Sequence, residues 1–397
     1  MLLQQTKKDM EQLCEQYFSH TVTMRRHLHQ HPELSGNELQ TADYIYSTLQ
    51  SWKIEAEKLL DGTAVVACIR GCKDGKQFVL GLRADIDALP IEETNSVDYC
   101  SHNKGVMHAC GHDVHTANLL TTARILNELK DRFSGVCIFI FQPSEECYPG
   151  GAKRLLEAHL LEKYSIKAMI GCHVSPEIPT GKIGLKSGNY MASTDEIYLD
   201  IFGKGGHAAL PATFINPLTL AAKILVEMEQ FCPKYAPKDI PSILTFGKIV
   251  GNGQTNVVPD KVHLEGTFRT FDENWRSQAY QKMEQICKHL AQQCGGDIQL
   301  TIRKGYPVLY NDPTLTEQCR QWAQEFLSAE QIELLDYRMT ADDFAYYSHL
   351  VPSFFYRLGT QIPNRTVNLH ASDFDVNENV FHFSSALLAY LACNILQ

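Results

Sequence analysis

The hydrophobic pattern of the chain alternates between two periods. Apolar side chains near helical spacing predict helices over residues 6–30, 37–49 and 114–129. The first helix should end before Pro32, because proline disfavours helical backbone in the residue that precedes it. Continuous apolar runs, typical of buried strands, occupy 64–70, 78–83, 135–141 and 168–173, with another late in the chain at 354–359.

The middle of the chain has a different order of elements. Strands are predicted over 195–203, 242–250, 262–270 and 297–304, and helices over 216–230 and 273–294. This βαββαβ order is the ferredoxin-like pattern, an antiparallel sheet backed by two helices. We therefore expect an α/β fold with a mixed sheet. Residues 1–186 and 305–397 should form one discontinuous domain, and residues 187–304 an inserted α+β domain.

Polar groups follow the predicted buried strands where each strand ends. These groups are Asp85, Asp87, Glu145, Glu146, His173 and His370. Reactive groups collect just past the carboxyl ends of parallel strands, so we expect these side chains to converge on one edge of a sheet. Each also has an ordinary explanation, because aspartates cap turns and exposed pairs of acids are common.

The size and composition of the chain limit the classes of protein to consider. Its 397 residues exceed one ordinary core, which favours two domains. The formal net charge of −10 argues against nucleic-acid binding, since phosphate affinity requires concentrated Lys and Arg. No apolar run reaches the roughly 18 residues of a membrane span, and the N-terminus lacks the apolar segment of a signal peptide. The 13 cysteines follow no disulfide framework, so we expect reduced thiols in a cytoplasmic protein.

The stretch MHACGHDVH at 107–115 gathers one thiol and three imidazoles. Cys110 and His112 fall in the turn that opens a predicted helix, and cysteine thiolate and neutral imidazole are ligands of zinc-like ions. A lone buried cysteine packs as a small hydrophobe, however, so the interpretation depends on partners elsewhere in the chain. The absence of a CxxC pattern excludes a zinc finger. We expect His27 and His29, on the first helix, to lie on a solvated face.

Five side chains from these segments make a candidate metal centre: Cys110, His112, Glu146, His173 and His370. Five ligands exceed the four of a closed structural zinc site and suit two divalent ions that share a bridging ligand and keep a position open for water. The adjacent Glu145 is then available as general base and as proton donor to a leaving amine. Thiolate and imidazole suit zinc, while manganese, cobalt and nickel remain open.

Seven motifs along nearly the whole chain resemble one family. They read RHLHQHPEL at 26–34, RADIDALP at 83–90, MHACGHD at 107–113, FQPSEE at 141–146, GGHAALP at 205–211, GTFR at 266–269 and LH at 369–370. In this order they are similar to the aminoacylase and hippurate hydrolase branch of the dinuclear metallopeptidases, which includes the plant auxin-amino-acid conjugate hydrolases. The resemblance implies hydrolysis of N-acyl amino acids by two divalent ions on the five ligands, with Glu145 as catalytic base. It also implies that the inserted domain forms a homodimer or a larger assembly.

The resemblance assigns roles to four further residues. Asp87 matches an aspartate that contacts the metal ligands and does not bind the metal itself. His207 matches a histidine that stabilises the carbonyl oxygen as it gains negative charge. Asn256 and Arg269 match positions near the substrate, and Arg269 could hold an amino-acid carboxylate by two hydrogen bonds. From position alone, His207 is an ordinary surface histidine and Arg269 a structural arginine on a strand.

Some features of the function remain open at this stage. Cys147-Tyr148-Pro149 follows the glutamate pair where relatives usually have small, glycine-rich sequence, and Asp342 stands where many relatives have Glu. Both departures leave the acyl group of the small-molecule substrate undefined. Three alternatives also stand: a dipeptidase or exopeptidase with the same metal site, a non-catalytic protein that binds metal or a small ligand, and a cysteine hydrolase that uses Cys110.

Overall fold

The computed structural model describes residues 2–75 and 77–397, and the chain divides into two compact units. The first unit contains Met1–Gly188, Tyr310–Asp336 and Tyr346–Gln397, and the second contains Asn189–Leu309 and Tyr337–Ala345. The chain passes into the second unit after Gly188 and returns to the first at Tyr310, within a few residues of the boundaries that we expected at 186 and 305. The segment Tyr337–Ala345 differs, because we expected it in the discontinuous domain. It joins the second unit since the backbone of Arg338 bonds to that of Tyr190 and of Ala192, at 3.0 Å each.

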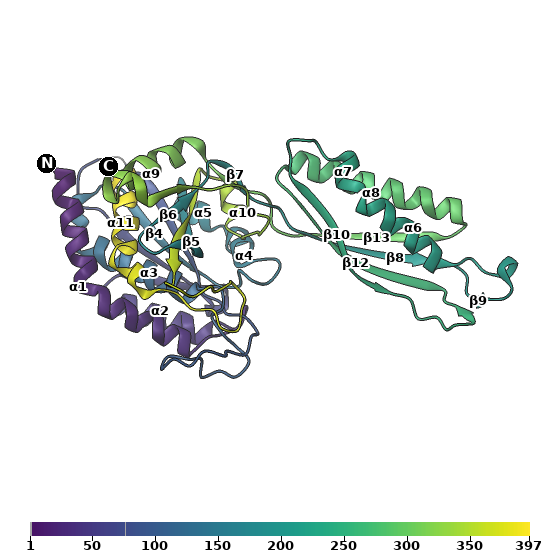
Figure 1. Cartoon of the computed structure of the whole chain (residues 1–397). Helices are drawn as coiled ribbons and strands as arrows, with labels where there is room; N and C mark the ends of the chain where they lie inside the picture. Colours follow the sequence, from purple (N-terminus) through teal and green to yellow (C-terminus); the bar gives the residue numbers. More distant parts are fainter. Residues whose placement is uncertain (1, 76) are drawn as a thin grey trace. The chain divides into compact units, whose positions relative to one another are not determined.

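The first unit is built on an eight-stranded mixed sheet (Figure 1). Its strands are, in spatial order, β1 (Glu55–Leu59), β2 (Ala64–Arg70), β4 (Val136–Gln142), β3 (Val79–Asp85), β5 (Ala168–Pro179), β16 (Ser353–Gln361), β6 (Ile183–Leu185) and β15 (Ile332–Leu334). The central strands β4, β3, β5 and β16 are parallel to one another. All residues of β4 are buried, so both faces of the sheet are covered there. The carboxyl ends of the four central strands therefore meet at one protected edge.

Helices α1, α3 and α11 of the first unit pack against one another beside this sheet (Figure 1). The helices of this unit are α1 (Leu2–Gln30), α2 (Leu39–Ser51), α3 (His112–Glu128), α4 (Gly151–Glu157), α5 (Leu160–Tyr164), α9 (Pro313–Phe326) and α11 (Ser384–Ile395), and α10 (Ala345–Ser348) begins at the boundary. Helix α3 is buried over most of its length, and polar side chains on it bond to the neighbouring helices. Thr121 bonds to Thr21 of α1 at 2.7 Å, and Asn118 accepts from Ser385 of α11 at 2.8 Å. This fixed helix carries His112 as its first residue.

The second unit is a four-stranded antiparallel sheet backed by helices α6 (Pro217–Glu229) and α8 (Glu273–Cys294) (Figure 1). The spatial order is β10 (Ser242–Val250), β12 (Lys261–Thr270), β8 (Asp195–Phe202) and β13 (Asp297–Lys304), as the βαββαβ pattern predicts. Alternate residues of β8 point into a core shared with the two helices. Its shorter elements are α7 (Phe231–Tyr235), β9 (Gly206–His207) and β11 (Val257–Val258). Two short strands, β7 (Gly188–Met191) and β14 (Leu309–Asn311), run across the unit boundaries. None of the helices that the structure describes has the length and apolar content needed to cross a bilayer.

Candidate metal centre

The five predicted ligands come together in the first unit although they belong to four separate segments of the chain. Cys110 and His112 flank the start of α3, and Glu146 follows β4. His173 lies in β5, and His370 lies in the loop after β16. The ligating atoms of Cys110, His112 and His173 lie within 4.8 Å of one another, as do those of Cys110, Glu146 and His370. The thiol of Cys110 is thus common to two groups of three.

The five side chains lie in close contact with one another. Cys110 Sγ lies 3.3 Å from His173 Nε2, and His370 Nε2 lies 3.0 Å from Glu146 Oε1. Among the described residues, neither Glu146 Oε1 nor His112 Nε2 has a partner in hydrogen-bonding geometry, although both atoms are buried. Buried polar atoms are normally satisfied. The donor set therefore fits soft and borderline divalent cations, which thiolate, imidazole and carboxylate bind together.

Two of the proposed imidazole ligands are oriented by a hydrogen bond at their Nδ1 atom. His173 Nδ1 donates to the carbonyl of Val174 at 2.8 Å, and His112 Nδ1 donates to the carbonyl of Asp87 at 2.9 Å. Because a carbonyl oxygen can only accept, the proton of each neutral ring is on Nδ1 and the lone pair is on Nε2. Such a partner on the far nitrogen is the usual arrangement of a histidine that ligates a metal.

Asp87 is buried and connects two of the ligand segments. Its Oδ1 lies 3.2 Å from His112 Nδ1, and its Oδ2 accepts from the backbone N–H of Glu146 at 3.0 Å and from Ser35 Oγ at 2.6 Å. Burial alone would raise the pKa of Asp87, but these hydrogen bonds outweigh it and lower the pKa below its ordinary value. An ionised Asp87 therefore positions both His112 and the Glu146 backbone.

The turn between Cys110 and His112 requires glycine. Gly111 has φ +84°, and a Cβ at this position would lie 2.5 Å from Val174 Cγ2. Left-handed backbone is unfavourable for residues with a Cβ, and the contact leaves no room for one. The same turn is bonded to the loop that carries His370, because the backbone N–H of His370 donates to the carbonyl of Ala109 at 2.8 Å. The side chain of His370 is 51% exposed, so the cluster opens to solvent on this side.

The loop that carries Glu145 and Glu146 is held at Ser144. Ser144 has φ +58°, which is strained for a residue with a side chain. Its N–H and its hydroxyl both donate to Glu38 Oε1, at 2.7 and 3.2 Å. Glu38 is fully buried at the start of α2, and burial raises its pKa. This contact fixes the backbone next to Glu145, which is itself 7% exposed.

The charges around the cluster favour a cation. Burial opposes protonation of His112, but Asp85, Asp87 and Glu146 outweigh it and raise the pKa of His112 to about 10. Burial, with Glu146 and Glu145, also raises the pKa of the Cys110 thiol well above its ordinary value. Both groups carry their protons until a divalent cation displaces them, so binding should release protons.

The residues predicted near the substrate lie in the second unit. His207 is exposed on β9, and its Nδ1 accepts from the backbone of Ala209 at 3.1 Å. The carbonyl of Asn256 accepts from the backbone of Ala208 at 3.0 Å, which brings Asn256 beside the His207 turn. Arg269 lies on β12, and its Nη1 donates to the carbonyl of Met339 at 2.9 Å. Their roles therefore remain predictions.

Some residues around the cluster were missed or misplaced by the sequence analysis. Ser35 and Glu38 were missed, because nothing in a short polar stretch shows that it will meet strand ends many residues away. The expectation of a solvated His29 was wrong. Its side chain is fully buried, with Nδ1 2.8 Å from Asp113 and Nε2 3.2 Å from Glu93. Asp113 was the sequence signal for a buried His29. It is an acid within the predicted metal-binding motif, and a buried acid needs a partner such as His29.

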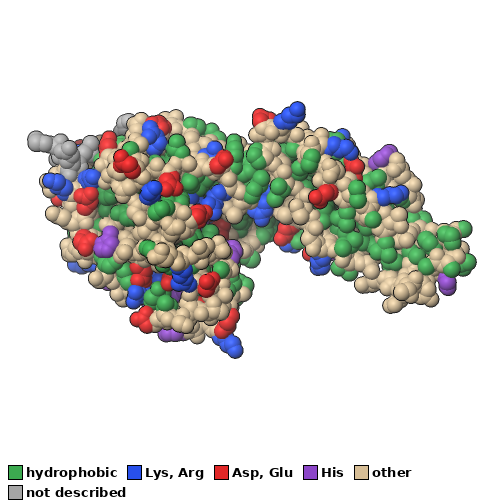
Figure 2. Space-filling view, in the orientation of Figure 1, with side chains coloured by type: hydrophobic (Ala, Val, Ile, Leu, Met, Phe, Trp, Pro, Cys, Tyr) green, Lys and Arg blue, Asp and Glu red, His purple; other side chains and the backbone are tan. Residues whose placement is uncertain are grey.

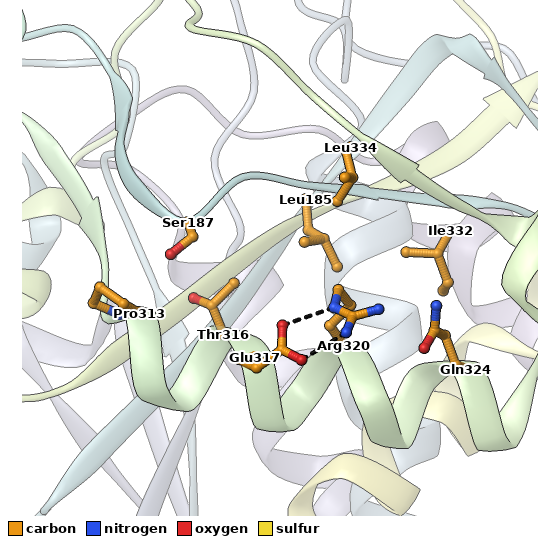
Figure 3. A pocket seen from close by; sticks show the side chains of 9 residues that line it. All are labelled: Leu185, Ser187, Pro313, Thr316, Glu317, Arg320, Gln324, Ile332 and Leu334. Carbon is orange, nitrogen blue, oxygen red and sulfur yellow. Dashed lines mark hydrogen bonds and ion pairs between the residues drawn. The ribbon is translucent and has the colours of Figure 1, made fainter.

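A separate pocket of the first unit is not part of this cluster. It has a volume of about 340 Å³ and lies between α9 and the strands β6 and β15 (Figure 3). Arg320 and Glu317 at its rim pair with each other, at 2.6 Å. None of the predicted site residues lines it, so its size does not make it the functional site.

Known proteins resemble this chain over most of its length. The profile of peptidase family M20/M25/M40 matches residues 81–394. An N-acyl-L-amino acid amidohydrolase of Geobacillus stearothermophilus is 38% identical over 308 residues, which are 77% of this chain and 82% of that protein. An N-acetyl-L-cysteine deacetylase of Bacillus subtilis is 38% identical over 341 residues, 85% of this chain and 80% of that protein.

The fold is also found in solved structures. A Bacillus subtilis protein described as a dinuclear metal binding peptidase from the M20 family superposes with a TM-score of 0.83 at 32% identity, covering 96% of this chain and 99% of that one. These findings confirm the mixed α/β fold and the resemblance that the motifs indicated. The chain belongs to peptidase family M20/M25/M40.

Proposed function

We propose that this protein is a metal-dependent amidohydrolase that cleaves N-acyl amino acids to a carboxylic acid and a free amino acid. The observation that carries the proposal is the convergence of five ligating side chains beside Glu145, two of which, His112 and Glu146, have buried atoms without a hydrogen-bond partner. The relatives named as an N-acyl-L-amino acid amidohydrolase and an N-acetyl-L-cysteine deacetylase support the reaction class.

The proposed centre would hold two divalent ions, and Cys110 would be available to both, because it belongs to each of the two groups of three that the five proposed ligands form. His112 and His173 complete one group, and Glu146 and His370 complete the other. Ions bound there would polarise the amide carbonyl and lower the pKa of water toward about 7. Thiolate and imidazole favour zinc, with manganese, cobalt or nickel as alternatives.

Glu145 has the proposed role of general base. Its carboxylate would take a proton from the attacking water as the C–O bond forms, and would return that proton to the nitrogen as the amide C–N bond breaks. The rigid backbone at Ser144, fixed by Glu38, suits a base that must keep one position through both transfers. Asp87 keeps the neighbouring Glu146 in place.

The residues of the second unit complete the proposal. His207, exposed in the GGHAALP motif, would donate to the carbonyl oxygen as it becomes negative, and such a donor is worth about 3–4 kcal/mol of barrier. Arg269 donates one hydrogen bond to Met339, and its other N–H groups would bind the carboxylate of the amino acid. Asn256 would contact the substrate beside His207.

We also propose a homodimer formed by the second unit, in the cytoplasm. Strand β10 is at an edge of its sheet, and Ile243, Ile249 and Val250 on it are 37–52% exposed. Figure 2 shows hydrophobic side chains gathered over this unit. Exposed edges with apolar side chains are normally covered by a partner. The described cysteines are all free thiols, which suits a reducing compartment.

A peptidase is the second candidate, because the Bacillus subtilis structure carries that description. The cysteine hydrolase is disfavoured, since the pKa of Cys110 is raised and a catalytic thiol needs a lowered one. The test is a substrate panel with metal-reconstituted protein: N-acetyl, N-benzoyl and indoleacetyl amino acids against dipeptides. Faster cleavage of N-acyl amino acids supports the proposal, faster cleavage of dipeptides supports the peptidase, and no cleavage of any substrate supports a binding protein.

A further inference from the structure

His115, the last residue of the MHACGHDVH motif, lies in the first turn of α3 and is buried. It is not one of the five proposed ligands, but its ring packs against that of His173, with ring centres 4.7 Å apart. Ligating atoms of His115, His112 and Asp85 also lie within 4.8 Å of one another, which is close enough for one ion. The hydrogen bonds of His115 indicate a different role.

Both nitrogens of the His115 ring have partners within the protein. The backbone N–H of Val174 donates to Nε2 at 2.9 Å, and Nδ1 lies 2.5 Å from Asp85 Oδ1. Because a backbone N–H can only donate, the lone pair of the ring is on Nε2 and the proton is on Nδ1, which donates to the Asp85 carboxylate. Neither nitrogen keeps a lone pair for an ion, so His115 contacts the centre without being a ligand.

The bond to Val174 replaces one that the sheet does not supply. Strand β5 continues to Pro179, whereas its pairing with β3 ends at Arg83 and Gly171. Val174 is fully buried and lies beyond this last pair, so strand β3 offers no partner to its N–H. A buried N–H without a partner is unfavourable, and the imidazole of His115 provides the acceptor.

The position of Val174 determines where the His173 ring points. The carbonyl of Val174 accepts from His173 Nδ1 at 2.8 Å, and the Val174 side chain fills the space next to Gly111. His173 Nε2 lies 3.3 Å from Cys110 Sγ. A shift of the Val174 backbone would therefore move Nε2 of His173 relative to the Cys110 thiol.

The Nδ1 side of the His115 ring is anchored to two further strands. Asp85, the last residue of β3, is fully buried, and its Oδ2 accepts from Arg83 Nη1 at 2.6 Å. Arg83 Nε donates to Oε1 of Gln142, the last residue of β4, at 3.1 Å. His115 is thus linked through Asp85 to the ends of β3 and β4, and through Val174 to β5.

We propose that His115 is a positioning residue, which keeps the His173 imidazole oriented toward a bound ion by fixing the backbone of Val174. Partners of this kind typically contribute about 10–100-fold to metal affinity. The inference rests on the metal centre of the proposed function and not on the reaction assigned to it. Metal binding, rather than turnover, therefore tests it.

The test compares two variants that retain different bonds of His115. In His115→Asn the amide N–H replaces the donor to Asp85, but the side chain is too short to accept from Val174. In His115→Gln the longer side chain brings an amide oxygen to the position of Nε2. The affinities for two Zn²⁺ ions are measured by competition with chelators, and the stability of the metal-free proteins by denaturant unfolding. The control is Thr121→Val, which removes a buried hydrogen bond of the same helix.

His115→Asn should weaken the binding of one Zn²⁺ ion by about 10–100-fold and leave the other unchanged, because only His173 loses its support. His115→Gln should weaken that ion by a smaller factor, and Thr121→Val should lower stability alone. Wild-type affinity for both ions in His115→Asn, or equal affinities in His115→Asn and His115→Gln, would overturn the role of His115 and leave the metal centre standing. A wild-type protein that binds no Zn²⁺ would instead overturn the proposed centre and this inference with it.

Discussion

The carboxylate of Asp87 accepts a hydrogen bond from the backbone N–H of Glu146 at 3.0 Å. With its other oxygen, Asp87 lies 3.2 Å from His112 Nδ1. One buried acid thus positions two proposed ligands from separate segments, the start of α3 and the loop after β4, and Ser35 holds that acid in turn. A change at Asp87 should therefore affect metal binding directly.

Replacing Asp87 with Ala should weaken metal binding by about 10–100-fold, because partners behind metal ligands typically contribute that much. The measurement is competition with a chelator of known affinity. Asp98→Ala is the control, since the side chain of Asp98 is 84% exposed. Unchanged affinity in Asp87→Ala would mean that His112 and Glu146 hold their positions without it.

Replacing Glu145 with Gln should lower kcat by about 10²–10⁴-fold, the range attributed to a positioned general base. Metal content should stay at the wild-type level, because Glu145 is not one of the five proposed ligands. Glu146→Gln is the matched variant and should lose bound metal as well as activity. Wild-type turnover in Glu145→Gln would remove Glu145 from the mechanism.

Replacing Gly111 with Ala should destabilise the protein more than replacing Gly36 with Ala. The two glycines have φ of +84° and +85°, so the backbone cost of about 1–2 kcal/mol is shared. A Cβ at Gly36 meets nothing within 4 Å, whereas one at Gly111 lies 2.5 Å from Val174. Overpacking should add about 1–3 kcal/mol at Gly111. Denaturant unfolding measures both, and equal losses would contradict this account of the turn.

The stability of the first unit should fall in acid through Asp113. Arg25 pairs with Asp113 at 2.7 Å, and both side chains are fully buried. Burial alone would raise the pKa of Asp113, but Arg25 and His29 outweigh it and hold the pKa well below its ordinary value. A lowered folded pKa gives stability that is complete above the unfolded pKa of about 3.9 and is lost as pH falls below it.

The variant Arg25→Met tests this contribution. It should cost about 3–5 kcal/mol near neutral pH, because it leaves Asp113 buried without its cation, and it should flatten the acid limb of the unfolding free energy. Arg320→Met is the control, since it breaks only the exposed pair with Glu317 and should change stability little. An acid limb of wild-type steepness in Arg25→Met would assign the pH dependence to other groups.

The convergence of the proposed ligands was predictable because the position of a residue after a buried strand predicts where it lies in the fold. Parallel buried strands align their carboxyl ends, so groups that follow apolar runs, such as Glu146 and His173, meet at one edge. Strand bounds were also predictable where alternation or apolar runs were long, as in β2 and β10. The start of α9 carried signals that were not used: Asp312 caps it, accepting from Leu315 at 2.8 Å, and Pro313 is its first residue.

What the sequence could not predict depends on contacts between distant segments. Glu38 precedes an ordinary surface helix, and only the fold shows that its carboxylate holds Ser144. His29 has the same residue type and helix as His27, yet one is buried beside Asp113 and the other lines a surface cavity. Helical periodicity places both on α1 but does not reveal which face a loop or a second helix will cover.

The central claim is that five side chains hold two divalent ions through a shared thiolate. An anomalous difference map, collected at the absorption edge of the bound metal from crystals of the reconstituted protein, tests it most directly. We predict two peaks per chain, each roughly 2.3 Å from Cys110 Sγ, one next to His112 and His173 and the other next to Glu146 and His370. A single peak, or peaks away from Cys110, would contradict the account.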